Sequence, residues 1–183
     1  MKVFVIIIIF QFLGFNTQTV YNVEPDGASM TVSGTSSLHD WESTVEDFEH
    51  TATVTVEGNT LIKMNQLEFT VPVKSIKSGK GGMDKKTYEA LRETDYPTIS
   101  YNLISAIPQS GNTVTSTGEL IIAGKKRKVS MDVNYEIYSN IIVFRGELTI
   151  KMSDYEISPP TALMGTIKTG DEVTIRFSIP FQK

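Results

Sequence analysis

The stretch LIIAGKKRKVSMDVNYEIYSNIIVFRGELTIKM, residues 120–152, decides the fold class of this sequence. Every second side chain is apolar on either side of two short polar links. A period of two is typical of β-strands with one buried face, and links this short join antiparallel neighbours. The stretch therefore predicts three consecutive antiparallel strands. Their inward sets are Leu120 and Ile122; then Val129, Met131, Val133, Tyr135 and Ile137; then Ile142, Phe144, Gly146, Leu148, Ile150 and Met152.

The same period continues through most of the chain, at residues 48–56, 62–73, 99–103 and 173–181. Within 62–73 the inward parity changes: Ile62 and Met64 share one face, whereas Leu67 and Phe69 require the other. This change near residues 65–66 predicts a β-bulge. With 21–23 and 30–34 added, the sequence predicts about eight or nine strands.

A helix is expected only at residues 83–92, where Asp84 is a suitable N-cap and Met83 and Tyr88 flank it at the staple positions. Pro97 prevents continuation of the helix. The glycines at 79, 81 and 82 form a flexible approach and match neither phosphate-loop pattern.

These elements predict an all-β fold, an antiparallel up-and-down barrel of about eight strands with one short helix. Closing the sheet removes its edges, and short links between consecutive strands favour the up-and-down arrangement. Strands of about ten residues span ~33 Å, which gives a barrel ~25 Å deep when the strands tilt by ~40°. The interior would be apolar, so a cavity inside it would suit a long apolar chain.

The N-terminus predicts export. Met1 and Lys2 precede an almost unbroken apolar run at residues 3–15 with a polar exit, as in a secretory signal. A membrane span needs roughly 20 residues, which is longer than this run. We expect residues 1–18 to be a cleaved signal peptide and 19–183 to be one domain in the periplasm or the medium, with an uncleaved anchor as the alternative.

Composition excludes several classes of function. The 183 residues include 17 Lys and Arg and 21 Asp and Glu, for a formal charge of -4, which argues against nucleic acid as a partner. The chain has no cysteine, which excludes disulfides, thiolate metal sites and cysteine nucleophiles. Only two histidines are present, so neither a metal site nor any cofactor is predicted.

Several strings in the mature part resemble the YceI-like family in order and spacing. They are residues 35–41 (TSSLHDW), 83–91 (MDKKTYEAL) with 96–99 (YPTI), 118–124 (GELIIAG) and 152–155 (MSDY). The resemblance implies a secreted, lipocalin-like barrel whose cavity holds a long isoprenoid or another amphiphilic lipid. The loop at 158–165 departs from the family's usual glycine-rich connection and is expected to shape the cavity mouth.

The string His39-Asp40-Trp41 is the first candidate site. His39 beside a carboxylate could hydrogen-bond the polar head of a ligand or act as a general base, with Trp41 covering an apolar chain. The alternative is structural: Asp40 caps a turn and Trp41 closes one end of the barrel. His50 has the apolar parity of its strand and is interpreted as a neutral, hydrogen-bonded core histidine.

The predicted cavity wall consists of residues on inward positions of the strands. Met and aromatic side chains adapt to irregular apolar ligands, although the same residues could fill a dry core. The basic run at residues 125–128 is interpreted as a solvated hairpin tip that blunts edge pairing, with contact to anionic lipid head groups or nucleic acid as the alternatives. The wall residues expected to bind ligand are Phe69, Tyr101, Leu120, Ile122, Met131, Val133, Tyr135, Phe144, Leu148, Ile150 and Phe177.

The sequence thus predicts a binding protein, not an enzyme, that sequesters or carries an isoprenoid or other long-chain amphiphile. Contact with membranes would be at most peripheral, and the oligomeric state is left open. Two alternatives remain: a small isomerase or hydrolase of lipophilic substrates with His39 as base, and a packed interaction module. The chain contains no GxSxG elbow and no recognised order of Ser, His and acid.

Overall fold

The computed structural model describes residues 19–22, 27–162 and 164–182. The predicted signal segment, 1–18, lies outside the described residues. The strands are β1 (Thr19–Asn22), β2 (Ser29–Ser36), β3 (Trp41–Val45), β4 (Glu49–Glu57), β5 (Thr60–Pro72), β6 (Ile76–Lys77), β7 (Thr98–Gln109), β8 (Thr113–Ile122), β9 (Lys125–Ile137), β10 (Ile141–Lys151), β11 (Thr161–Ala162) and β12 (Ile167–Gln182). The helices are η1 (Val73–Ser75), α1 (Gly81–Ala90) and η2 (Met152–Tyr155).

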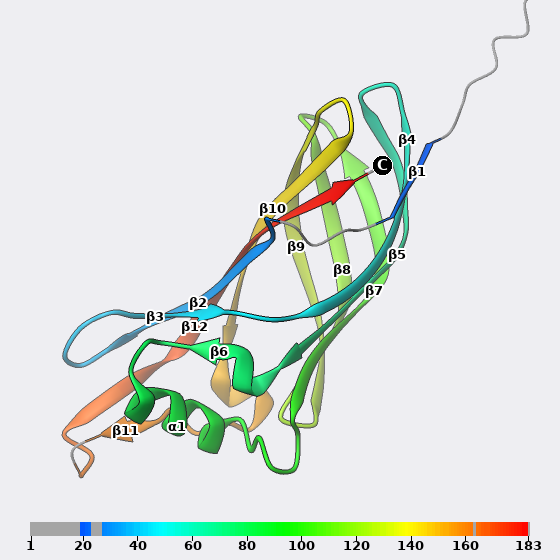
Figure 1. Ribbon diagram of the computed structural model, residues 1–183. Coiled ribbons are helices and arrows are strands. Elements are labelled where there is room, and N and C mark those ends of the chain that lie inside the picture. Colours follow the sequence, from blue (N-terminus) through cyan, green and yellow to red (C-terminus); the bar gives the residue numbers. More distant parts are fainter. Residues whose placement is uncertain (1–18, 23–26, 163, 183) are drawn as a thin grey trace, which may run out of the picture.

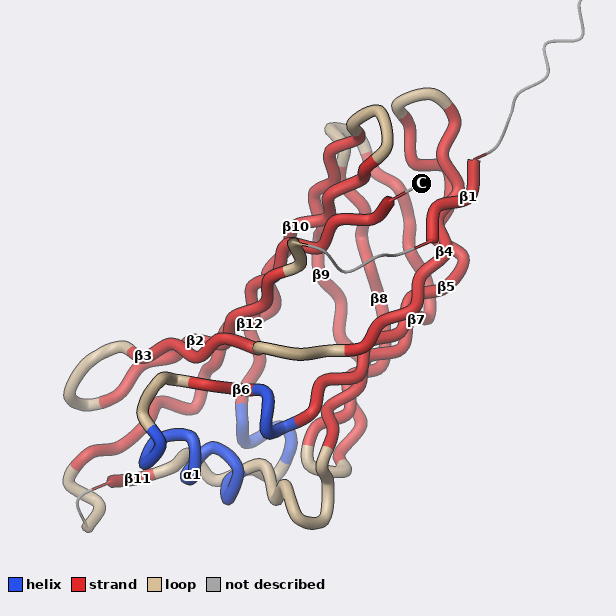
Figure 2. The backbone as a smooth tube through the Cα atoms, in the orientation of Figure 1, coloured by secondary structure: helices blue, strands red, loops and turns tan. Residues whose placement is uncertain are grey.

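The strands form one curled antiparallel sheet, as the sequence predicts (Figures 1 and 2). From β4 the order is β5, β7, β8, β9, β10, β12, β2, β3, so most neighbours in the sheet are also consecutive in the chain. The last strand of this order, β3, is connected through residues 46–48 to β4, the strand at which the order starts. β3 also pairs with β6. β1 lies against β4 and pairs with β12 at Asn22 and Gln182.

The described residues form twelve strands where about eight or nine were expected. The difference arises from three short strands that the sequence interpretation did not anticipate, namely β3, β6 and β11. β3 and β4 are separated by residues 46–48, and β5 and β6 are separated by η1. β1 corresponds to the strand expected at residues 21–23, and β11 is an addition of two residues.

The predicted bulge in β5 is confirmed. Thr53 pairs with Gln66 and Val54 pairs with Met64, so Asn65 is the extra residue. A second irregularity follows, because the next pairs skip Ile62 and bring Leu61 inward. Leu61 is therefore 1% exposed and Ile62 is 41% exposed, and the expectation that Ile62 faces inward with Met64 is wrong.

The β8–β9 hairpin is confirmed, but its tip is not the basic run. The strands pair as far as Ile122 and Lys125, which leaves only Ala123 and Gly124 in the turn. Both turn residues have positive φ, 49° and 77°, as a two-residue type I′ turn requires. The lysines belong to β9, where Lys125 forms an ion pair with Glu156 at 2.7 Å. The prediction of a four-cation tip is wrong.

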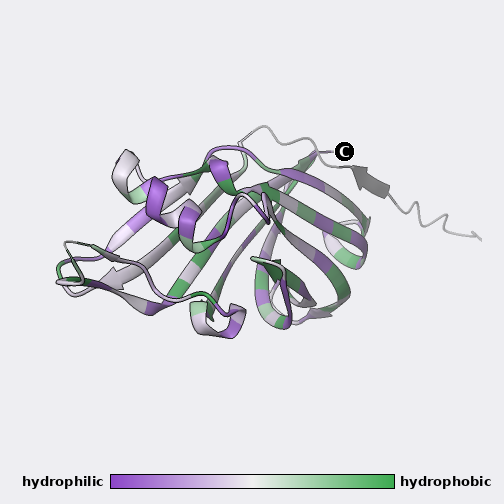
Figure 3. Cartoon of the chain, turned by 90° about the horizontal axis from the view of Figure 1, so that it is seen from below, coloured by the Kyte–Doolittle hydropathy of each residue, from purple (hydrophilic) through white to green (hydrophobic). Residues whose placement is uncertain are grey.

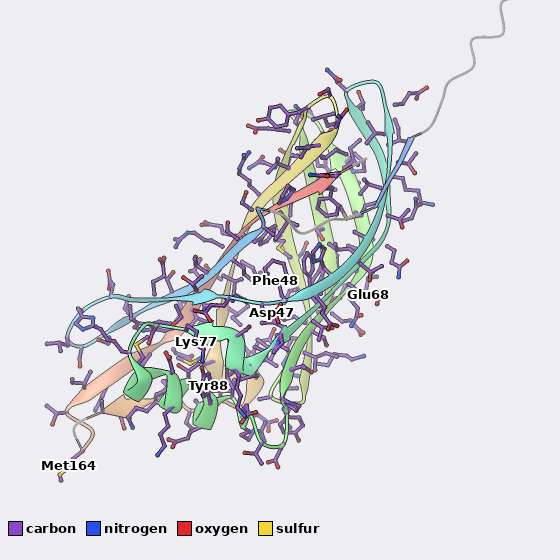
Figure 4. The ribbon with its side chains drawn as sticks, in the orientation of Figure 1. Asp47, Phe48, Glu68, Lys77, Tyr88 and Met164 are labelled. Atoms are coloured by element: carbon purple, nitrogen blue, oxygen red, sulfur yellow. The ribbon has the colours of Figure 1, made fainter. Side chains whose placement is uncertain are left out.

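Helix α1 begins at Gly81 with Lys80 as its N-cap, so the expectation that Asp84 caps the helix is wrong. Asp84 instead accepts hydrogen bonds from the backbone N–H of Ser78 at 2.8 Å and from its hydroxyl at 2.5 Å, which hold the Asp84 pKa below its ordinary value. The phenol oxygen of Tyr88 accepts a hydrogen bond from Lys77 at 2.8 Å (Figure 4). No residue of α1 is buried, so these hydrogen bonds to Lys77 and Ser78 contribute to holding the helix against the barrel.

The packed core occupies the half of the barrel near the β4–β5 hairpin and the end of β12. Apolar and polar residues alternate along the strands (Figure 3). Val54 and Ile142 are both 0% exposed in the largest cluster of core residues. Towards α1, inward residues of β10 such as Leu148 and Ile150 are only half-buried, which indicates that the interior there is not filled by side chains.

Candidate ligand-binding cavity

Two adjoining apolar hollows occupy the barrel. The inner hollow, of about 110 Å³, lies between the strands. The outer hollow, of about 530 Å³, opens between α1, the β2–β3 hairpin and the segment that carries β11. Ile99 and Ile175 line both hollows, so the two hollows are neighbours at these two side chains. The outer volume alone lies within the range of roughly 300–1,000 Å³ that is typical of small-molecule sites.

Most of the predicted wall residues are brought together around the inner hollow. They lie on inward positions of β5, β7, β8, β9, β10 and β12, because side chains of one parity share one face of a strand. The polar groups among the lining residues are Ser100, Ser116 and the Tyr101 phenol. The predicted residues found here are Phe69, Tyr101, Leu120, Met131, Val133, Phe144, Leu148 and Phe177.

The outer hollow receives four more of the predicted residues, namely His39, Trp41, Ile122 and Ile150. The remaining two do not line either hollow. Asp40 is exposed in the β2–β3 loop, and Tyr135 is 4% exposed in the packed core, with its ring centroid 6.0 Å from that of Phe144.

His39 and Asp40 do not form a side-chain pair. The His39 ring nitrogen Nδ1 lies 2.7 Å from the backbone oxygen of Asp40, not from its carboxylate. The Trp41 indole N–H donates to the backbone oxygen of Thr35 at 3.1 Å, which fixes the ring beside Gly34. The string therefore supplies an aromatic wall and an imidazole at the mouth, without the orienting carboxylate of a catalytic base.

Helix α1 supplies wall residues that the sequence interpretation missed. Met83, Thr87 and Ala90 of α1, together with Leu91 at its C-cap, line the outer hollow. Their spacing of four, seven and eight residues from Met83 is that of one helix face, which was a readable signal. Tyr155 and Ile157 also line this hollow, as do Pro160, Thr161 and Ala162 from the loop expected at the cavity mouth.

Two buried tyrosines beside the hollows differ in hydrogen bonding. The Tyr101 hydroxyl lies 2.8 Å from Ser116 Oγ, and burial raises its pKa against the smaller opposite effect of that bond. Tyr155 is 1% exposed, and its hydroxyl has no partner among the described residues. Burial raises the pKa of Tyr155 to about 12, outweighing the opposite effect of Arg127, so the phenol stays protonated at neutral pH.

We expect Tyr101→Phe and Tyr155→Phe to change stability in opposite directions. Tyr101→Phe leaves Ser116, which is 3% exposed, without its bond and should cost about 1–2 kcal/mol of unfolding free energy. Tyr155→Phe removes an unpaired buried hydroxyl and should be neutral or stabilising by up to about 1 kcal/mol. Urea unfolding of the two variants measures both effects. A loss of stability in Tyr155→Phe equal to that in Tyr101→Phe would contradict this assignment.

His50 lies in an aromatic cluster next to the inner hollow. Its ring centroid is 5.7 Å from that of Phe69, in a stacked arrangement, and 5.6 Å from that of Phe48. Its Nε2 has no hydrogen-bond partner among the described residues. Desolvation lowers the His50 pKa below its ordinary 6.5, against the opposite effect of a backbone hydrogen bond to Phe48.

The lowered pKa predicts a loss of stability in mild acid. Below pH 6.5 the unfolded chain protonates His50 while the folded chain does not, so unfolding becomes more favourable as the pH falls from 7 towards the folded pKa. We expect His50→Leu to reduce the slope of melting temperature against pH between 7 and 5.5. Thermal melts across this range would refute the expectation if the slopes of the two proteins coincided.

The described residues contain no group of three or more His, Asp or Glu side chains arranged to hold a metal ion. Within the same residues, no helix combines the length and hydropathy needed to cross a membrane.

The fold and the two hollows define a lipocalin-like antiparallel barrel with an apolar cavity. The chain belongs to the family of the YceI-like domain, whose family model matches residues 21–181. This match confirms the resemblance drawn from the strings at 35–41, 83–91, 96–99, 118–124 and 152–155.

Similar solved structures have the same fold. BcnA of Burkholderia cenocepacia has a TM-score of 0.73 at 20% identity, over 86% of this chain and 98% of that chain. The YCEI protein of Campylobacter jejuni has a TM-score of 0.64 at 15% identity, over 77% and 84%. A polyisoprenoid binding domain from Saccharophagus degradans, implicated in plant cell wall breakdown, has a TM-score of 0.61 at 10% identity, over 88% and 97%. No curated protein matches this chain significantly.

Proposed function

We propose that this protein binds a long-chain hydrophobic ligand, an isoprenoid or another amphiphilic lipid, within the barrel and carries or sequesters it. The observation that carries the proposal is the pair of adjoining hollows, whose shared residues Ile99 and Ile175 allow one extended apolar volume. Burying apolar surface at ~25 cal/mol per Å² would supply the binding free energy, and no reaction is required.

The polar groups are placed to orient such a ligand. His39, Lys80 and Lys86 line the outer hollow, whereas the inner hollow is lined almost entirely by apolar side chains. A chain lying in the inner hollow would therefore have its polar head towards α1 and the β2–β3 loop. The polyisoprenoid binding domain of the same fold supports an isoprenoid as one form of the ligand.

We further propose that the protein acts in the periplasm or the medium. The support is the apolar run at residues 3–15 after Lys2, which fits a secretory signal. The protein would then hold a poorly soluble molecule in an aqueous compartment between membranes.

Native mass spectrometry tests the proposal. The full chain is expressed in a bacterial host, purified from the envelope fraction and measured without detergent, and a parallel sample is extracted with organic solvent. We expect a discrete added mass and a lipid in the extract. The measured protein mass also locates any cleavage after residues 1–18. A protein that carries no added mass and binds no added fatty acid or prenol would overturn the proposed function.

A further inference from the structure

Two loops lie at the same end of the molecule, where the outer hollow opens. They are the β2–β3 loop, residues 37–40, and the β11–β12 loop, which includes residues 164–166 (Figure 1). The backbone N–H of Ser37 donates to the Lys168 oxygen at 2.9 Å, and the Lys168 N–H donates to Ser37 Oγ at 3.0 Å. These bonds hold both loops at the same end of the molecule, away from the end of β12 (Figure 1).

Each loop exposes a large apolar side chain to water. Leu38 is 65% exposed and also lines the outer hollow, and Met164 is fully exposed at the tip of its loop (Figure 4). These are the two highest exposures among the large apolar side chains of the described residues. Met164 also has a φ of 54°, a left-handed conformation in which glycine or asparagine would be less strained. Folding alone does not account for an exposed methionine there.

The charged side chains that line the outer hollow are basic, whereas the whole chain is acidic. The outer hollow is lined by Lys80 and Lys86 and by no Asp or Glu among the described residues. Asp84 and Glu89 of α1 do not line the hollow; Asp84 accepts a hydrogen bond from Ser78, and Glu89 lies 3.9 Å from Lys85. Lys168 adds a third cation beside the loops, and Asp40 is the one carboxylate in residues 36–41 and 158–168. The chain as a whole has a net charge of -4.

We propose that this end of the protein docks on the surface of a bilayer that contains anionic lipids. Leu38 and Met164 enter the boundary between head groups and acyl chains, while Lys80, Lys86 and Lys168 contact the anionic head groups. Both interactions are those by which peripheral proteins bind membranes. The inference rests on the proposed function, since docking with the hollow facing the bilayer lets an insoluble chain enter or leave without crossing water.

Vesicle binding tests the proposal directly. The probe is large unilamellar vesicles of phosphatidylcholine alone or with phosphatidylglycerol at a mole fraction of about one third. We expect the purified protein to co-sediment with the mixed vesicles and much less with phosphatidylcholine alone. Trp41, the single tryptophan of the chain, lines the same hollow and gives a second readout through quenching by lipids with brominated acyl chains.

Matched variants separate the two contributions. Met164→Ser with Leu38→Ser should lower partitioning into mixed vesicles at least tenfold, because two apolar side chains no longer leave water. The control is Ile104→Ser with Ile107→Ser on β7, whose side chains are 54% and 57% exposed away from the mouth and should leave partitioning unchanged. Lys80→Gln with Lys86→Gln should lower partitioning by up to about thirtyfold, because each lysine near an anionic surface contributes about 1 kcal/mol and 1.4 kcal/mol corresponds to about tenfold. The control is Lys85→Gln, which is paired with Glu89 and does not line the hollow.

Two results would overturn docking. One is wild-type protein that binds neither vesicle type, and the other is a loss of vesicle binding in the Ile104 and Ile107 control equal to that in the Leu38 and Met164 variant.

Failure of docking alone would appear as cargo-loaded protein that does not bind vesicles. Failure of the proposed function would instead appear as protein without cargo in native mass spectrometry. Met164→Ser alone, which changes no residue lining a hollow, should retain cargo while losing part of the vesicle binding.

Discussion

Replacing Ile150 with asparagine is expected to weaken binding of a long-chain ligand more than about 100-fold while the protein stays folded. Ile150 is half-buried on β10 and lines the outer hollow. In the free protein an asparagine there would face the hollow and remain hydrated. A bound apolar chain would strip that hydration and lose the isoleucine contact, at a combined cost of roughly 3–5 kcal/mol. Each 1.4 kcal/mol corresponds to about tenfold in affinity.

The same substitution at Ile142 is expected to unfold most of the protein. Ile142 lies on the same strand and the same face as Ile150, but it is 0% exposed in the packed core beside Phe144 and Phe181. Loss of the buried side chain and burial of an unpaired amide should cost about 4–6 kcal/mol, which is comparable to the stability of a typical domain. The eight-residue shift along β10 therefore changes a binding defect into a folding defect.

Circular dichroism and ligand titration measure the pair. Ile150→Asn should keep the strand spectrum and the cooperative melt of the wild type, with fatty-acid binding lost. Ile142→Asn should lose the cooperative melt or lower its midpoint strongly. Full ligand affinity in Ile150→Asn would show that the outer hollow does not receive the chain.

The second large effect is expected from Gly118→Ala. A Cβ at Gly118 would overlap the ring and hydroxyl of Tyr101, which lies across this glycine in the barrel wall. The ring would have to move and would lose its bond to Ser116. Overpacking typically costs about 1–3 kcal/mol and loss of the buried bond about 1 kcal/mol more, so we expect a total near ~3 kcal/mol. For a chain of this length the melting temperature would fall by about 6–12 °C.

Gly81→Ala provides the matched control for this change. A Cβ at Gly81 meets no atom within 4 Å, and the residue is in the first turn of α1. Alanine favours a helix by up to about 1 kcal/mol over glycine, so the variant should be neutral or slightly more stable. Differential scanning calorimetry compares the two. A melting temperature in Gly118→Ala equal to that of the wild type would mean that Tyr101 can leave the wall at no cost.

The alternation of side chains was sufficient to predict the antiparallel barrel and much of its interior. Phe144, Phe177 and Met131 line the inner hollow as their parity indicated, because a strand has only two faces and apolar residues occupy the inner one. The bulge at Asn65 was also readable, since an extra residue reverses the parity. The second irregularity, at Ile62, was missed because Leu61 and Ile62 are both apolar and either could face inward.

Only the tertiary structure decided which inward residues border a hollow and which fill the core. Tyr135 and Phe144 are both inward, yet Tyr135 is enclosed by the core and Phe144 reaches the inner hollow. The lining face of α1, the unpaired hydroxyl of Tyr155 and the placement of Leu38 and Met164 at one end of the molecule likewise depend on segments distant in the chain. Local sequence fixes the direction of a side chain from its strand or helix. What that side chain meets is set by the way the sheet curls, which depends on all strands together.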